Sequence, residues 1–214
     1  ATLATRLMRD FPDYVPYYAI QRYRYPGTPA ANDSNRNLLL FRDPSVDGLK
    51  TGHTDAAGYC LVATAKRDVP ALGSGVAGQR RLLSVMLGTS SENARATESQ
   101  KLLNWGYTAF DTVRLFPAGQ PVATPAVWKG QAAVVKLGRP EGVIVTVPAG
   151  EGAKLKTEVV RPDPLVAPLQ KGQKLGSLKI STGGGVAIQV EIGPWVQTSV
   201  YDGTLDLFKP CRAG

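Results

Sequence analysis

The chain is poor in the residues that build metal centres and disulfide frameworks. Its 214 residues include one histidine, two cysteines and two methionines. A single histidine and two distant cysteines, Cys60 and Cys211, cannot supply the ligand spacing of a zinc site or a catalytic Cys-His cluster. We therefore expect no metal and no cofactor. Cys60 lies in an apolar stretch and is predicted to be buried, Cys211 is predicted to be exposed, and a disulfide between them is not expected.

Long apolar runs are also missing. No stretch reaches the ~18 apolar residues of a membrane-spanning helix, and no secretory signal sequence is recognised. Residues 1–9 have the pattern of a helix end, so we expect a further region, with any leader, to lie before Ala1. Ser199–Phe208 has only a weak apolar face and is followed by Pro210, which leaves attachment to a membrane surface undecided.

A basic stripe of the kind that binds nucleic acid is absent, although the net charge is +8. Lys and Arg outnumber Asp and Glu by 13 to 9 in residues 1–107 and by 12 to 8 in residues 108–214. Because the excess is evenly spread, we interpret it as a solvated basic surface and expect no nucleic-acid partner. Such a surface also suits anionic cell-wall material or lipid headgroups.

The composition changes near residue 110. Before this point helix and strand signals alternate, and after it the signals are strands separated by Gly and Pro. We therefore predict an α+β portion over residues 1–110, an all-β, sandwich-like domain over 111–200 and a tail over 201–214. The first portion is predicted to contain a helix end at 1–9, extended segments and turns over 10–29, a hairpin of strands 50–54 and 59–66, a loop over 67–79, a strand at 80–88 and a helix at 90–107.

The motif Lys50-Thr51-Gly52 begins the predicted hairpin. A strand edge offers unpaired backbone groups to an extended peptide, and a residue without Cβ lets that peptide approach closely. Lys50 supplies a positive charge and Thr51 a hydroxyl for a carboxylate, while the next backbone N–H can point at a developing oxyanion. The tripeptide alone is a weak signal, since chance produces it in about one protein in forty of this length.

The surroundings of the motif strengthen it. Lys-Thr-Gly is one of three active-site signatures of β-lactamases and penicillin-binding proteins. From about residue 1 to about residue 195 the sequence resembles the low-molecular-mass penicillin-binding proteins of the D-alanyl-D-alanine carboxypeptidase type. The resemblance implies a partial serine β-lactamase/transpeptidase-like α/β (α+β) domain followed by an all-β domain. It is carried by residues 35–41, 46–54, 57–59, 95–107 and, more loosely, 167–173.

The resemblance also implies roles for six residues. Those that line the cleft and bind the terminal carboxylate region of the substrate are Lys50, Thr51, Gly52, His53, Arg36 and Arg95. His53 would in addition supply a backbone N–H to the oxyanion hole. An arginine suits a carboxylate because its planar fork binds bidentately. Two alternatives stay open: a helix-surface position for Arg95, and a structural bond to a loop carbonyl for Arg36.

The reaction implied by the family is acyl transfer. A serine attacks the carbonyl of the penultimate D-alanine, D-alanine leaves, and water hydrolyses the acyl-enzyme; β-lactams acylate the same serine. No serine in this sequence is followed three positions later by lysine, so we assign no nucleophile and expect the chain alone to be inactive. Two further signatures of these enzymes, Ser-x-x-Lys and Ser-x-Asn, are expected upstream of Lys50; Ser91-Glu92-Asn93 fits the second by letter but lies downstream. Asp47 and Asp55 are interpreted as turn or capping residues.

Three hypotheses follow for the function. The first is part of a serine-type carboxypeptidase, either truncated or paired with an N-terminal fragment of the same protein, with peptidoglycan pentapeptide and β-lactams as ligands. The second is a non-catalytic module that binds cell-wall glycan, peptide or a partner protein. The third is a β-lactamase-like hydrolase, which a second all-β domain argues against. The first implies a periplasmic protein of the bacterial cell envelope, with a peripheral position on the inner membrane left open.

Overall fold

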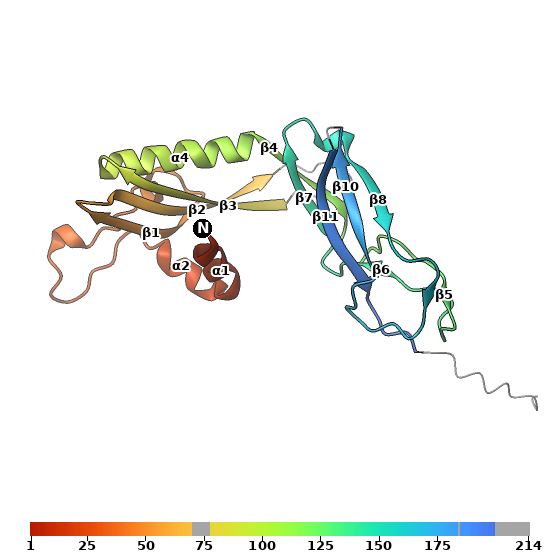
Figure 1. Cartoon of the computed structure of the whole chain (residues 1–214). Coiled ribbons are helices and arrows are strands. Elements are labelled where there is room, and N and C mark those ends of the chain that lie inside the picture. The colour runs from red at the N-terminus through yellow and green to blue at the C-terminus, as the bar shows by residue number, and fades with distance from the viewer. Residues whose placement is uncertain (70–77, 184, 200–214) are drawn as a thin grey trace, which may run out of the picture. The chain divides into compact units, whose positions relative to one another are not determined.

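The computed structural model of the protein describes residues 1–69, 78–183 and 185–199. These residues form two compact units (Figure 1). The first unit contains residues 1–69, 78–112 and 148–150, and the second contains residues 113–147, 151–183 and 185–199. No helix among the described residues is both long and apolar enough to cross a membrane.

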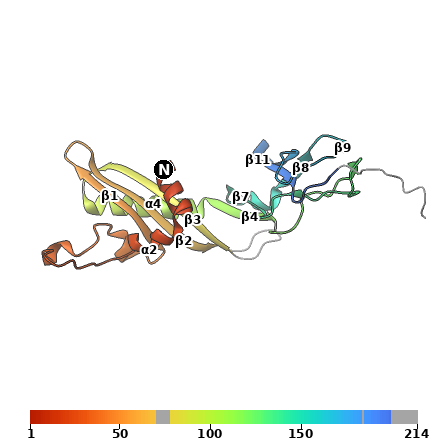
Figure 2. The same cartoon turned by 90° about the horizontal axis from the view of Figure 1, so that it is seen from below.

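An antiparallel three-stranded sheet forms the centre of the first unit. Its strands, in the order β1-β2-β3, are β1 (Val46–Thr54), β2 (Gly58–Val69) and β3 (Gly78–Thr89). Helix α4 (Glu92–Thr108) covers one face, and the short helices α1 (Thr2–Asp10) and α2 (Val15–Tyr18) lie on the other side (Figures 1 and 2). Helix α3 (Leu39–Arg42) precedes β1 and contributes two residues to the core.

The core of this unit lies between α3, the sheet and α4. Leu61, Ala63 and Ala65 of β2 share one face of the sheet, because successive side chains of a strand point to opposite faces, and Thr64 between them is buried on the other face. Helix α4 begins where Ser91 caps it: the Ser91 hydroxyl accepts a hydrogen bond from the Ala94 N–H at 3.0 Å. The buried apolar residues of the core are Leu39, Leu40, Val46, Leu61, Ala63, Ala65, Ala96 and Leu103.

The predicted hairpin, the following strand and the long helix are confirmed, and the strands are longer than predicted. The loop predicted over 67–79 is wrong at both ends, since β2 continues to Val69 and β3 begins at Gly78; residues 70–77 lie outside the described part. The segment 10–29 is not only extended: it contains the 3-10 turn η1 (Pro12–Tyr14) and helix α2. Pro12 and Pro16 sit in the first turns of these elements, where a missing N–H removes no helical hydrogen bond.

The described residues of the second unit form strands and no α-helix. A four-stranded sheet has the order β6-β11-β10-β8, and two-stranded sheets pair β4 with β7 and β5 with β9. The elements are β4 (Phe110–Phe116), which begins in the first unit, β5 (Val127–Trp128), β6 (Leu137–Gly138), β7 (Val143–Pro148), whose last residue belongs to the first unit, the 3-10 turn η3 (Gly152–Lys154), β8 (Lys156–Val160), β9 (Leu165–Val166), β10 (Gly176–Thr182) and β11 (Gly185–Pro194). The first unit, described above, also contains the 3-10 turn η2 (Ala30–Asn32).

Alternation of side chains gives the second unit its own apolar interior. In β7 the residues Val143, Val145 and Val147 are buried and the residues between them are exposed, which is the pattern of a strand with one solvent-exposed face. Leu178 and Ile180 of β10 and Ile192 of β11 are also buried. The all-β character agrees with the sequence, while sandwich-like packing and the boundary at residue 110 stay predictions. The predicted tail, 201–214, lies outside the described residues.

We expect an excised segment of residues 111–200 to fold by itself, because its buried valines, leucines and isoleucines form a core within the segment. The measurement is far-ultraviolet circular dichroism with thermal unfolding: a strand-type spectrum and one cooperative transition are expected. A segment of residues 125–200, which lacks β4, is the control and should unfold at lower temperature. A disordered spectrum for residues 111–200 would contradict the predicted boundary.

Candidate active site

The Lys50-Thr51-Gly52 motif lies in the second half of β1, at an edge of the sheet. Among the described residues β1 pairs with β2 alone, with Lys50 opposite Val62 and Gly52 opposite Cys60. An edge strand with one partner presents unpaired N–H and C=O groups on its other side. The motif therefore lies on a strand to which an extended peptide can be added.

Side chains of the motif are available to a ligand. Lys50 is exposed and its Nζ donates a hydrogen bond to the backbone oxygen of Thr51; the Thr51 side chain is half-buried. A Cβ atom added to Gly52 would meet only the Cβ of Cys60, at an ordinary contact distance of 3.9 Å. Packing within the described chain therefore does not require glycine at position 52, and space beside the strand remains.

His53 is exposed and rests on an aromatic neighbour. Its ring lies over that of Tyr59, its cross-strand partner, with 3.9 Å between ring centroids and 31° between planes. Tyr59 also lies 5.5 Å from the guanidinium carbon of Arg95. The sequence did not identify Tyr59 as part of the site; its only signal was its place opposite His53 in the predicted hairpin. The imidazole thus has a fixed support at the edge of the motif.

Arg95 lies inside the first unit, while its predicted place at the substrate cleft stays a prediction. Its side chain is 2% exposed and its guanidinium is held by the protein itself. Nη2 donates to the carbonyl oxygen of Arg36 at 2.9 Å and to Glu92 Oε1 at 3.1 Å, and Nη1 donates to the carbonyl oxygen of Gly52 at 3.4 Å. Its position inside the unit also excludes the helix-surface alternative. Arg95 ties α4 to the motif strand and to the loop before α3.

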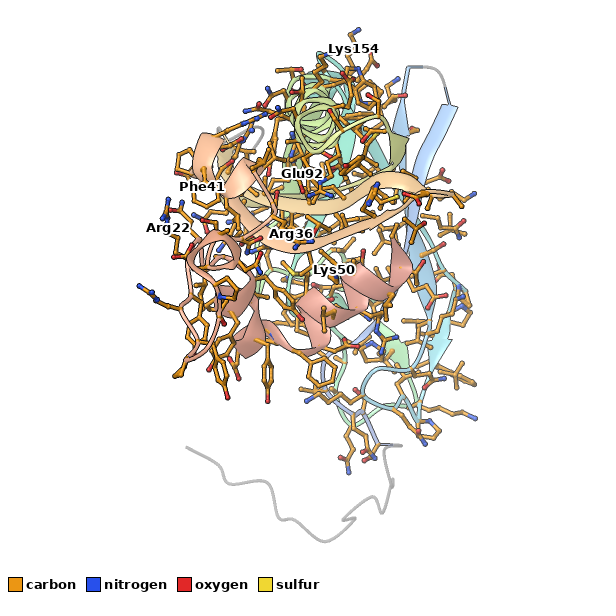
Figure 3. All side chains as sticks on the ribbon, turned by 90° about the vertical axis from the view of Figure 1, so that its left-hand side faces the viewer. Arg22, Arg36, Phe41, Lys50, Glu92 and Lys154 are labelled. Atoms are coloured by element: carbon orange, nitrogen blue, oxygen red, sulfur yellow. The ribbon has the colours of Figure 1, made fainter. Side chains whose placement is uncertain are left out.

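Arg36 stands where its guanidinium can reach a ligand. The residue is exposed, and its side chain has no hydrogen bond or ion pair within the described part of the chain; its carbonyl is the group that Arg95 binds. The structural bond from the Arg36 side chain to a loop carbonyl, an open alternative, is therefore not formed. Figure 3 shows Arg36, Lys50 and Glu92 on the same end of the first unit, in agreement with the bonds of Arg95 to both segments.

Asn37 fixes the loop that carries Arg36 and was missed in the sequence. It is buried, and its Nδ2 donates to the carbonyl oxygen of Gly48 in β1 at 3.0 Å. Its Oδ1 accepts a hydrogen bond from the Leu39 N–H at 3.2 Å at the start of α3. A buried amide that is bonded at both ends positions backbone segments that would otherwise be independent. The Arg36 loop and the motif strand are thereby held side by side.

Asp47 is not a turn or capping residue. It lies within β1 and binds Arg81 of β3 through two contacts of 2.7 Å, and the Thr64 hydroxyl of β2 donates to the same carboxylate. This bidentate pair links all three strands below the motif. Asp55 lies in the exposed turn of the hairpin, as predicted.

A second network supports the other end of the sheet. Arg67 donates to Asp43 Oδ2 at 2.7 Å, and its guanidinium carbon lies 4.4 Å from the Tyr107 ring centroid. Burial raises the pKa of Asp43, but hydrogen bonds from Ser45 and the charge of Arg67 outweigh it and hold the pKa below its ordinary value. Burial likewise raises the pKa of Tyr107, whose hydroxyl faces the backbone oxygens of Ala65 and Arg80. These groups anchor α4 to the sheet.

Cys60 is half-buried rather than buried, and its sulfur lies 3.5 Å from the carbonyl oxygen of Ala57. The sequence predicted full burial from the apolar run, but β2 is still near the hairpin turn at this position and is less covered there. Cys60 is a free thiol in the structure. Cys211 lies outside the described residues.

Comparisons with known proteins match both units. Residues 1–90 match a family model for D-alanyl-D-alanine carboxypeptidase, and residues 110–195 match one for the C-terminal domain of penicillin-binding protein 5. D-alanyl-D-alanine carboxypeptidase DacA of Escherichia coli K12 is 37% identical over 186 residues, which are 86% of this chain and 43% of that protein. DacF of Bacillus subtilis is 34% identical over 153 residues, 71% of this chain and 37% of that protein.

Solved structures give the same result. Penicillin-binding protein 5 of Haemophilus influenzae superposes with a TM-score of 0.77 at 31% identity, over 92% of this chain and 54% of that one. The carboxypeptidase DacD of Francisella tularensis gives 0.58 at 26% identity, over 94% of this chain and 59% of that one. The chain thus spans about half the length of these relatives or less. It belongs to the low-molecular-mass penicillin-binding proteins of the D-alanyl-D-alanine carboxypeptidase type and represents part of such a protein.

Proposed function

We propose that this chain is part of a serine-type carboxypeptidase that removes the terminal D-alanine of peptidoglycan pentapeptides and is acylated by β-lactams. The observation that supports this most directly is the exposed Lys50-Thr51-Gly52 segment on an edge strand with no second partner among the described residues. An extended peptide can pair with that edge, and its terminal carboxylate then comes beside Lys50 and Thr51. The activity belongs to the whole protein.

Each side chain of the site has a role in this proposal. Lys50 stabilises negative charge at the reacting end of the substrate, Thr51 donates its hydroxyl to the carboxylate, and the open space at Gly52 admits the peptide backbone. The N–H of His53 donates to the oxyanion. Arg36 adds a second cation for the carboxylate, because its guanidinium is exposed and uncommitted in the described chain. Arg95 acts as a positioning residue through the backbones of Gly52 and Arg36.

The serine nucleophile and its lysine belong to a further part of the protein that faces this edge. Large apolar side chains of the first unit support this view, because among its described residues they are exposed over residues 1–41 and on no other comparable stretch. Leu3 is 85% exposed, and six further residues are at least 44% exposed: Phe11, Tyr14, Tyr17, Tyr23, Tyr25 and Phe41. Large apolar side chains that are exposed in such number favour a contact with another part of the protein. An N-terminal fragment of the same protein fits this surface.

The expected setting is the bacterial periplasm, where peptidoglycan is accessible to the enzyme. A peripheral position on the inner membrane is compatible with the net charge of +8, since basic surfaces are attracted to anionic lipid headgroups. The second candidate function, a non-catalytic module for cell-wall or partner binding, is favoured only for the second unit, which contains a groove of its own.

Labelling with a fluorescent penicillin tests the proposal. We expect the whole protein to give a covalently labelled band on a denaturing gel, and this 22.8 kDa chain alone to give none. Boiled whole protein is the control for adventitious labelling. A labelled band at the mass of this chain would mean that one of its own serines is the nucleophile. Absence of label on active, folded whole protein would instead count against the carboxypeptidase assignment.

A further inference from the structure

One strand of the second unit has an open edge beside a groove. Strand β11 pairs with β10 along residues 185–192, but on its other side β6 pairs with it only at Gly193 and Pro194. The groove, about 710 Å³ in volume, follows this edge. It is lined by residues 138–141 after β6, by residues 171–174 before β10 and by consecutive residues 189–195 of β11 and its continuation. The proposed carboxypeptidase activity does not use this groove.

Backbone direction decides which groups of β11 are free. The carbonyl oxygens of Ile192 and Pro194 accept hydrogen bonds from Leu175 and Gly172, on the β10 side, and the N–H of Trp195 donates to Lys136, on the β6 side. Backbone groups of a strand point alternately to its two edges, and the register with β10 is uninterrupted from residue 188 to residue 192. The N–H and C=O groups of Gln189 and Glu191 therefore point to the edge that β6 leaves open.

Local sequence explains why β6 stops. Directly after Gly138 the chain turns away at Arg139–Gly142, where the Gly142 N–H donates to the Arg139 carbonyl at 2.9 Å. Pro140, in this turn, has no N–H with which to continue a ladder. On the β10 side of β11 the main chain of Gln173 packs directly against Gly193. A Cβ atom at position 193 would lie 2.2 Å from the Gln173 carbonyl oxygen. The groove is therefore formed by two turns, one on each side of β11, next to a strand edge that has no partner.

Charge favours an acidic occupant. The side chains around the groove include three cations and two carboxylates: Arg139 pairs with Glu141, Lys174 pairs with Glu191, and Lys171 is exposed and forms no ion pair with any described residue. Residues 113–199 contain ten Lys and Arg against five Asp and Glu. We propose that the open edge of β11 binds an extended, acidic peptide segment of a partner protein, which adds to the sheet as a further strand. This inference is independent of the proposed carboxypeptidase activity.

The test uses the whole chain and a fluorescein-labelled peptide of eight alternating threonine and glutamate residues, followed by fluorescence anisotropy at low salt. Saturable binding is expected. Gln189→Pro removes the outward N–H at position 189 without touching the ladder to β10, whereas Gln189→Ala keeps it; both lose the side-chain bond to Ser177. We expect Gln189→Pro to abolish binding and Gln189→Ala to retain it. Equal thermal unfolding of the two variants shows that both are folded.

Two further arms separate charge from backbone pairing. Lys171→Glu should lower the affinity for the acidic peptide by about two- to fivefold, the effect of one exposed ion pair. A peptide with proline at every second position should not bind. Chito-oligosaccharide should not displace the peptide; displacement would mean that the groove is a glycan site. That outcome, equal binding by Gln189→Pro and Gln189→Ala, or the lack of saturable binding by the wild-type chain would each overturn the proposal.

Discussion

Replacing Arg95 by methionine should destabilise the first unit by about 3 kcal/mol, the order of magnitude for removing charged hydrogen bonds from a buried position. Methionine retains much of the apolar volume but none of the donors. The carbonyl oxygens of Gly52 and Arg36 would lose a bond at a site that is 2% exposed, and Glu92 would lose its partner. Denaturant unfolding of the whole chain, followed by a probe in the first unit, measures the change.

The matched control for this variant is Arg42→Ala. Arg42 also binds α4, through Asn93 at 2.7 Å and Thr97 at 3.5 Å, but it is exposed. Exposed polar contacts of this kind contribute about 0.5 kcal/mol or less. Hydrogen exchange adds a local readout: in Arg95→Met the amides around Gly52 and Arg36 should exchange faster, and in Arg42→Ala they should not. If Arg95→Met had wild-type stability and wild-type hydrogen exchange, Arg95 would not hold α4 to the motif strand and to the Arg36 loop.

The sequence predicted the elements of the first unit that local patterns determine. The hairpin of β1 and β2 follows from the apolar run at residues 59–63 and from the turn at residues 55–58, and α4 follows from a serine that can cap its start. The place of the Lys50 motif on an edge strand was predicted in the same way. The short helices around Pro12 and Pro16 were not, because a proline at the start of a helix and a proline in a turn look alike in a sequence.

Burial of polar residues was the part that could not be predicted. The position of Arg95 on α4 did contain a signal, since it lies four and eight residues before Ser99 and Leu103, on the buried stripe of the helix. An arginine on such a stripe either is buried and bonded to carbonyl oxygens, or shows that the buried face of the helix has been assigned wrongly. A single sequence does not distinguish the two. Asp47 pairs with Arg81, and the Asn37 side chain binds the carbonyl oxygen of Gly48. Both contacts join residues that are distant in sequence. Such contacts depend on the tertiary fold alone.

Lys50→Ala in the whole protein should lower the rate of acylation by penicillin by about 10²- to 10³-fold, the effect of removing one group that stabilises charge in a preorganised site. Folding should be little affected: Lys50 is exposed, and within the described part of the chain its Nζ forms a hydrogen bond only with the backbone oxygen of the neighbouring Thr51. Stopped-flow or gel measurement of acyl-enzyme formation with a fluorescent penicillin gives the rate. Unchanged thermal unfolding would confirm that the loss is not caused by misfolding.

Lys66→Ala is the matched control, because Lys66 is an exposed lysine on β2 of the same sheet, where it pairs with Arg81 of β3 rather than with a residue of the motif. It should acylate at the wild-type rate. Lys50→Arg separates charge from shape: arginine keeps the positive charge but replaces a compact ammonium by a planar fork, so partial recovery is expected if charge is the main contribution. A wild-type rate in Lys50→Ala, or an equal loss in Lys66→Ala, would mean that the motif lysine does not act on the reacting group. The edge of β1 would then bind peptide through its backbone and through Arg36, and the cation needed at the reacting end would have to come from another part of the protein.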